Sequence, residues 1–194
     1  GNNAAIVRNS ERAELFRETC RIAVSEGGFA TARVIELDDK GAARVAATTE
    51  TDSRVFQEVL DDYNGDPAGA SSLLAQALRG GKPVVSNDLV HDPRVHERTT
   101  LASEGTYALA LLPLTAEQRT TGVIILRSRE AGIFDEEEMA LLNELAGDVS
   151  PLAELVLERQ RVGQVVASRA HLGAHERRRV VTLVLGRIHL LKGN

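Results

Sequence analysis

The chain has 194 residues, of which 43% are apolar, and its formal net charge is −5. This composition supports one well-cored domain and excludes wholesale disorder, and no apolar run approaches the roughly 18–20 residues of a membrane span. Residues 161–194 carry seven Lys or Arg and one Glu, which leaves −11 for residues 1–160 by difference. We therefore expect one domain at 1–160, too acidic for a nucleic-acid partner, and a separate basic segment at 161–194.

The first predicted elements are a helix and a β-hairpin. Residues 10–28 place apolar side chains at helical spacing and end in a Gly-Gly pair. Cys20 lies on this apolar stripe and is expected to be a buried small hydrophobe. It is the one cysteine, so the chain forms no internal disulfide and no thiolate metal cluster, which fits a reducing cytoplasm. Residues 29–39 and 42–50 flank a turn and predict the two strands of the hairpin.

Two short helices and three strands follow. Residues 53–64 have helical apolar spacing, and a second helix is expected to start with Asp66 as its cap and to end at the Gly-Gly pair at 80–81. A short apolar strand then leads into a polar loop. Residues 106–114 and 120–128 predict two further strands, and the strongly apolar Val-Ile-Ile-Leu run indicates that the last of them is central and covered on both faces.

The last strong helix begins near Asp135, which is expected to be its N-cap, with Glu138 as the capping-box partner. Pro151 predicts a kink or a restart, with Ser150 available to cap the new segment. Apolar positions nevertheless continue to residue 166 at spacings of three, four and seven. Such a stripe usually marks a contact surface, so we expect a homodimer formed by the first helix and by residues 135–161.

The basic tail at 161–194 also has helical spacing. It is interpreted as a helical linker to an effector domain, as the start of a following domain, or as a basic surface, and we favour the linker. The chain opens without Met and ends without a recognisable tail. We therefore expect it to be a piece of a longer protein, with no membrane partner in this piece.

The polar loop after the short strand concentrates the chemically active side chains of the chain. His91 and His96 are five residues apart, not at the i, i+4 spacing of a helical metal-binding pair, so we expect no metal site. No Ser–His–Asp or paired-carboxylate pattern indicates catalysis, and His91, His96 and Asp92 are the only candidates for it. We favour a structural loop in which Asn87 and Asp88 bond neighbouring backbone groups and Asp92-Pro93 opens a helix.

Four stretches, in this order, resemble a GAF domain, the sensory module of bacterial signalling proteins: LFRETCRIAVSEGGFATARV, ALRGGKPVVSNDLVHDPRV, GTYALALLPL and TTGVIILRSREAGIFDEEEMALLNELAGDV. The resemblance spans about 4–161. It implies an α+β fold with a central antiparallel sheet, the first and last helices on one face, and short helices and loops covering a pocket on the other. Members bind a small molecule or a partner surface and act on a downstream histidine kinase, diguanylate cyclase or transcription activator.

The specialised members of that family differ from this sequence. Bilin-binding members use a cysteine near the pocket, whereas Cys20 lies on the first helix, and methionine sulfoxide reductase members need several cysteines. Cyclic-nucleotide-binding members carry an Asn-Lys pair, whereas here Asp88 follows Asn87. The resemblance therefore names no cofactor.

The residues and the resemblance together support three hypotheses: a small-molecule sensor, which we favour, a ligand-free dimerisation scaffold, and an enzyme. The pocket is expected between the sheet and the segment 53–101. The candidate ligand-binding residues at its rim are Asn87, Asp88, His91, Asp92 and Tyr107.

Overall fold

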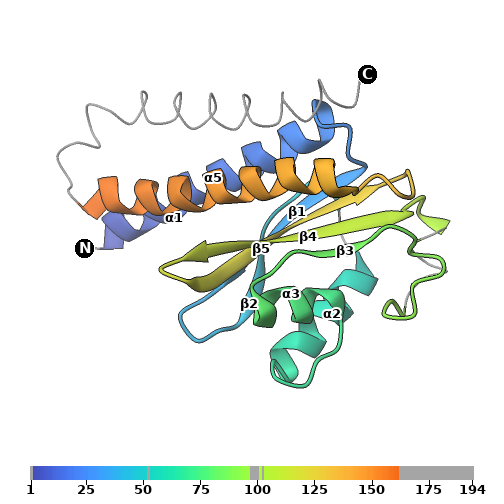
Figure 1. Cartoon of the computed structure of the whole chain (residues 1–194). Coiled ribbons are helices and arrows are strands. Elements are labelled where there is room, and N and C mark those ends of the chain that lie inside the picture. The colour runs from blue at the N-terminus through green and yellow to red at the C-terminus, as the bar shows by residue number, and fades with distance from the viewer. Residues whose placement is uncertain (1, 52, 97–100, 102, 162–194) are drawn as a thin grey trace.

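One five-stranded antiparallel sheet lies between two layers of helices in the computed structural model, which describes residues 2–161 except 52, 97–100 and 102 (Figure 1). The strands are β1 Thr31–Leu37, β2 Ala43–Thr48, β3 Val84–Ser86, β4 Ala108–Ala116 and β5 Arg119–Ser128. Their order across the sheet is β2-β1-β5-β4-β3. The predicted α+β class is confirmed. None of the helices in the described ranges is long and apolar enough to cross a membrane.

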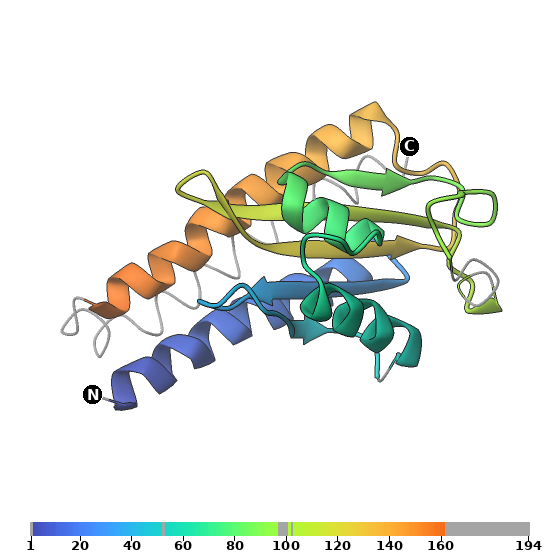
Figure 2. The same ribbon diagram turned by 90° about the horizontal axis from the view of Figure 1, so that it is seen from below.

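The two long helices, α1 Asn2–Ser25 and α5 Glu136–Arg161, pack side by side on one face of the sheet (Figures 1 and 2). Phe16 and Ile22 of α1 and Leu142 of α5 are fully buried in the core between these helices and the sheet. The shorter helices α2 Arg54–Gly65 and α3 Leu73–Gly80 cover the opposite face. This division of helices between the faces is the one that the resemblance implies.

The alternation of strand side chains separates the two cores. On β1, Ala32 and Val34 face α1 and α5, whereas Ile35 belongs to the core under α2 and α3. β5 is buried from Gly122 to Ser128 because β1 and β4 pair with its two edges and helices cover both of its faces. The prediction that this strand is central is confirmed.

The start of α3 corrects the prediction. Asp66 does not cap this helix: its backbone N–H donates to Asp62 at the C-terminus of α2, and its carboxylate accepts from the N–H of Gly69 in the following turn. α3 begins only at Leu73, where the Ser72 hydroxyl accepts from the N–H of Ala75. Both Asp and Ser suit a cap, and the geometry of the turn decides between them.

α5 begins as predicted but does not break where expected. Asp135 accepts from the backbone N–H of Glu138 at 2.8 Å, which confirms the N-cap. The helix then continues through Pro151 to Arg161, and Ser150 caps nothing because its hydroxyl donates back to the carbonyl of Ala146. Pro151 deprives a single carbonyl, that of Gly147, of its helical donor. Gly147 is exposed, so water can replace that donor.

The first helix is longer than predicted, whereas the first hairpin is as predicted. α1 starts at Asn2, eight residues before the predicted start, and its N-terminal part projects past the sheet beside the C-terminal part of α5 (Figure 2). The predicted hairpin is confirmed, since β1 and β2 pair antiparallel. The predicted tail is 161–194, and all of it after Arg161 lies outside the described residues, so the boundary near residue 160 stays a prediction.

Candidate functional site

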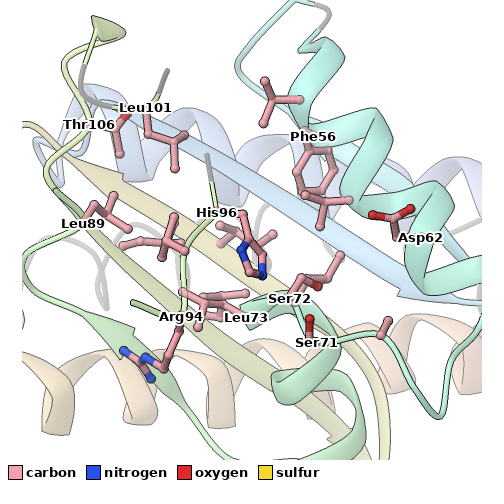
Figure 3. A pocket seen from close by; sticks show the side chains of 18 of the residues that line it. Phe56, Asp62, Ser71, Ser72, Leu73, Leu89, Arg94, His96, Leu101 and Thr106 are labelled. Carbon is pink, nitrogen blue, oxygen red and sulfur yellow. The ribbon is translucent and has the colours of Figure 1, made fainter. Parts of the chain in front are cut away.

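A cavity of about 310 Å³ lies between the sheet and its short covering elements, at the lower end of the volumes typical of small-molecule sites (Figure 3). It is bounded by β4 and β5 on one side and by α2, α3, Leu89, residues 94–96 and Leu101 on the other. Its wall is mostly apolar: Val55, Phe56, Val59, Leu73, Leu74, Leu89, Val95, Leu101, Leu109, Leu111 and Ile125. The cavity therefore lies where the sequence predicts a pocket, under the segment 53–101.

The space exists because the covering elements are short and are joined by small residues. Ser53 caps α2 by accepting from the N–H of Phe56 at 3.2 Å, and Ser72 caps α3 in the same way. The residues between the two helices that line the cavity are small: Asp66, Gly69, Ala70 and Ser71. They leave room that larger side chains would fill, so the two helices cover the sheet without packing tightly against each other.

One end of the cavity carries a buried cluster of charges on the sheet face. Arg127 of β5 lines the cavity, and its Nη1 lies 3.2 Å from Oε1 of Glu50. Arg33 of β1 binds the other oxygen of the same carboxylate, with Nη2 2.7 Å from Oε2. The guanidinium of Arg33 also lies 3.9 Å from the ring centroid of Phe56, a cation–π contact with the cavity wall. Two buried guanidinium groups thus share one carboxylate.

The burial of the charged Arg33 guanidinium is electrostatically unfavourable. Its side chain is 6% exposed, and burial, together with the positive charge of Arg127, lowers the pKa of the Arg33 guanidinium from its usual range. Glu50 acts in the opposite direction, through its charge and its hydrogen bond. Chemically, this end of the cavity offers N–H donors and positive charge, which suit an anionic group.

Most other polar residues of the lining are exposed, whereas Thr106 is buried. Asp62, Asp66 and Ser71 lie along the end of α2 and the turn that follows it, and all three are exposed. His96 is also exposed, and in Figure 3 its imidazole lies between the sheet strands and α3. The cavity therefore has an apolar body, a cationic inner end and a polar opening.

Asn87, one of the five predicted ligand-binding residues, has a structural role and does not line the cavity. Its Oδ1 accepts from the N–H of Phe134 at 2.9 Å, and its Nδ2 donates to the carbonyl of the same residue at 2.8 Å. These bonds join the end of β3 to the start of α5. The favoured structural interpretation is supported, but the predicted partners were wrong, because they lie 47 residues away rather than next to Asn87.

The other four candidates do not line the cavity either. Asp88 and His91 form an exposed pair, with Oδ2 and Nδ1 2.8 Å apart. Asp92 opens no helix, because residues 91–95 form turns; its carboxylate accepts from Arg94, which holds its pKa well below the usual range. Tyr107 is 40% exposed. Their contact with a ligand stays a prediction.

The structure also places the candidates for metal binding and catalysis. Among the described residues, no group of three or more His, Cys, Asp or Glu side chains is arranged to hold a metal ion. Cys20 lies in the core on the opposite face of the sheet, where burial raises the pKa of its thiol to about 12. Asp92 is engaged by Arg94 and His91 by Asp88, so neither is grouped with His96 in the cavity wall.

The residues that sequence reasoning missed are Arg33, Glu50 and Arg127. The sequence contains a signal for two of these residues: Arg33 interrupts one apolar strand, and Arg127 lies near the end of another. A charged side chain inside a buried strand requires a partner and often marks a site. Glu50 follows β2 with no such sign, and only the pairing of β1 with β2 and β5 brings the three together.

Comparison with known proteins gives a family and a fold. A family model described as a GAF domain matches residues 9–152. No curated protein sequence matches the chain. Similar solved structures include a GAF domain region from Geobacter sulfurreducens, with a TM-score of 0.63 and 18% identity over 78% of this chain and 98% of that one.

Two further structures have the same fold and different activities. One is the type II free methionine-R-sulfoxide reductase of Thermoplasma acidophilum, with a TM-score of 0.58 and 14% identity over 77% of this chain and 96% of that one. The other is a domain assigned to a two-component sensor histidine kinase of Sinorhizobium meliloti, with a TM-score of 0.55 and 15% identity over 78% of this chain and 96% of that one. At these identities the likeness shows the fold and leaves the activity open.

Proposed function

The chain belongs to the GAF domain family, and on that premise we propose that it is a sensory module that binds a small molecule and passes a conformational change to a downstream effector domain. The observation that carries this proposal is the cavity of about 310 Å³ with its apolar wall. A site of this kind, with few polar groups and short covering elements, is typical of small-molecule binding. The open cavity weighs against the alternative of a ligand-free scaffold, which needs that space filled by side chains.

The proposed route of the signal runs through the sheet. A ligand in the cavity contacts β4 and β5, and the other face of β4 packs against α5. Both α1 and α5 project beyond the sheet on the same side (Figures 1 and 2). An effector domain that follows α5 in the full protein, such as that of a two-component kinase, would receive a shift of this helix directly.

We further propose that two copies associate through α1 and α5. The support is the apolar spacing of the sequence to residue 166 and the projecting ends of the two helices. Light scattering at micromolar concentration should give twice the 20.9 kDa mass of the chain. Charged substitutions at Leu152 and Leu155 should return the mass to that of a monomer. A monomeric wild-type chain contradicts this part of the proposal.

Ligand binding is tested by thermal unfolding with a panel of metabolites, nucleotides and short organic acids. A ligand at about 100 times its dissociation constant stabilises the folded state by about 2.7 kcal/mol. Val59→Trp places a large ring in the cavity wall and should abolish the response, whereas Glu58→Trp, at an exposed position of the same helix, should retain it. A response that survives Val59→Trp contradicts binding in this cavity.

We propose no enzymatic activity for the chain. The reductase of the same fold acts on methionine sulfoxide, but here the one cysteine, Cys20, is buried on the far face of the sheet. A reduced, unpaired thiol also fits the cytoplasmic location that we propose. Turnover that is lost on replacing His91, His96 or Asp92 would contradict this part of the proposal.

A further inference from the structure

Arg127 is a buried cation in the wall of a mostly apolar cavity. Its side chain is 7% exposed, and it comes from the same face of β5 as Ile125, which also lines the cavity. A buried charge is costly unless it is paired, so the geometry of its partners shows whether a place remains for a ligand.

The described partners of Arg127 all lie near one nitrogen of its guanidinium, Nη1. Nη1 contacts Glu50 at 3.2 and 3.4 Å and lies 3.8 Å from Glu104. Within the described part of the chain, Nε and Nη2 make no hydrogen bond that would compete with a ligand. These two nitrogens form the planar fork that binds a carboxylate through two parallel hydrogen bonds.

The charges at this end are paired only loosely. Arg33 and Arg127 share the carboxylate of Glu50, and the second carboxylate, that of Glu104, is 44% exposed and lies 3.8 Å from Arg127, too far for a hydrogen bond. Nη1 of Arg33 is buried without a hydrogen-bond partner. An anion on Arg127 would therefore be a closer negative partner than Glu104.

The other side chains of the cavity wall indicate the chemical character of the rest of the ligand. Aliphatic side chains dominate it. Its one phenyl ring, that of Phe56, already lies against the guanidinium of Arg33, and its one imidazole, that of His96, is exposed. A flat aromatic ligand would therefore find little to stack on. The cavity of about 310 Å³ is at the lower end of the volumes of small-molecule sites, which favours a small ligand.

We propose that the cavity binds a small aliphatic carboxylic acid, with its carboxylate on the Nε–Nη2 fork of Arg127 and its chain along the apolar wall. This inference rests on the proposed function, since it names the ligand class of the same cavity. The acid donates no proton to the site, because a short aliphatic acid is already ionised at neutral pH.

The first test uses the wild-type chain and four probes in isothermal titration: octanoate, 1-octanol, octylamine and acetate. Octanoate should bind at least tenfold more tightly than each of the others, because it alone has both the chain and the anion. Equal binding of octanol shows that the charge contributes nothing, and equal binding of acetate shows the same for the chain. Either result, or tighter binding of octylamine, overturns the inference.

The second test changes the fork. Arg127→Gln should weaken octanoate at least tenfold and leave octanol unchanged, and Arg119→Gln, at an exposed position in the β4–β5 hairpin, should change neither. If Arg127→Gln does not fold, Arg127→Lys keeps a cation opposite Glu50 but loses the fork, and should still weaken octanoate severalfold. Unchanged octanoate binding in the variant that folds overturns the inference.

The outcomes separate the inference from the proposed function. If a nucleotide or another metabolite stabilises the protein in a manner sensitive to Val59→Trp while octanoate does not bind, the inference fails and the sensory proposal stands. If nothing in the panel binds, both fail.

Discussion

Replacing Asn87 with Ala should destabilise the fold strongly, although this residue lies on a loop and outside the cavity. The side chain makes two hydrogen bonds to the backbone of Phe134, at 2.9 and 2.8 Å, and the Phe134 side chain is buried and stacked 6.0 Å from Phe29. At about 1 kcal/mol net for each bond, the loss is about 2 kcal/mol. For a domain of this size, that lowers the melting temperature by roughly 4–8 °C.

Urea denaturation of wild type, Asn87→Ala and a control measures this loss. The control is Asp88→Ala, the next residue, whose carboxylate pairs only with the exposed His91 among the described residues. An exposed pair contributes little, so the control should lie within about 0.5 kcal/mol of wild type. Equal stability of the two variants, or an Asn87→Ala variant within about 0.5 kcal/mol of wild type, would refute the argument that Asn87 joins β3 to α5.

Three further predictions address other parts of the fold. Gly122→Ala should lower the free energy of unfolding by more than about 2 kcal/mol in urea denaturation, because a Cβ there would meet a backbone carbonyl of β1. In the same assay, Gly147→Ala on α5 should be neutral or stabilising by up to about 1 kcal/mol, because its Cβ would meet open space. Because burial raises the pKa of its thiol to about 12, Cys20 should resist iodoacetamide at pH 8 in the folded protein and react fully in urea. Mass spectrometry follows the labelling, and rapid labelling of the folded chain would contradict this prediction. Since Arg94 lowers the pKa of Asp92, the folded state is favoured while Asp92 is ionised. This stabilisation decreases progressively as the pH falls from the unfolded value of about 3.9 through the lower pKa of the folded state. Asp92→Asn should therefore be about 1 kcal/mol less stable than wild type at pH 7 and approach it below about pH 4, and a difference independent of pH would contradict the assignment.

Much of the fold follows from local pattern. The apolar stripe of residues 10–28 and the Asp135 cap identify the two long helices, and the run at 123–126 identifies the central strand, because these features depend on residues close to one another. Errors occur where two local solutions compete. Asp66 and Ser72 are both good caps, and Pro151 breaks a helix only if the carbonyl that it orphans is not solvated.

The sequence predicts where the cavity lies but not which polar residues line it. The short elements of the segment 53–101 indicate a loosely packed cover, and the cavity lies beneath it. Polar residues that cluster in the sequence, such as Asp88 and His91, pair with each other at the surface instead of facing the cavity. A polar cluster in a loop satisfies its own hydrogen bonds locally, so clustering along the chain is a weak guide to a binding site.

The sequence alone determines the order of the elements, the two long helices and the central strand, since periodicity and capping act over a few residues. The tertiary structure decides the rest, because strand pairing is non-local. The antiparallel register of β1 with β5 places Arg33 on the same face as Arg127, and both reach Glu50. Three charges separated by up to 94 residues share one buried site, and no local rule connects them.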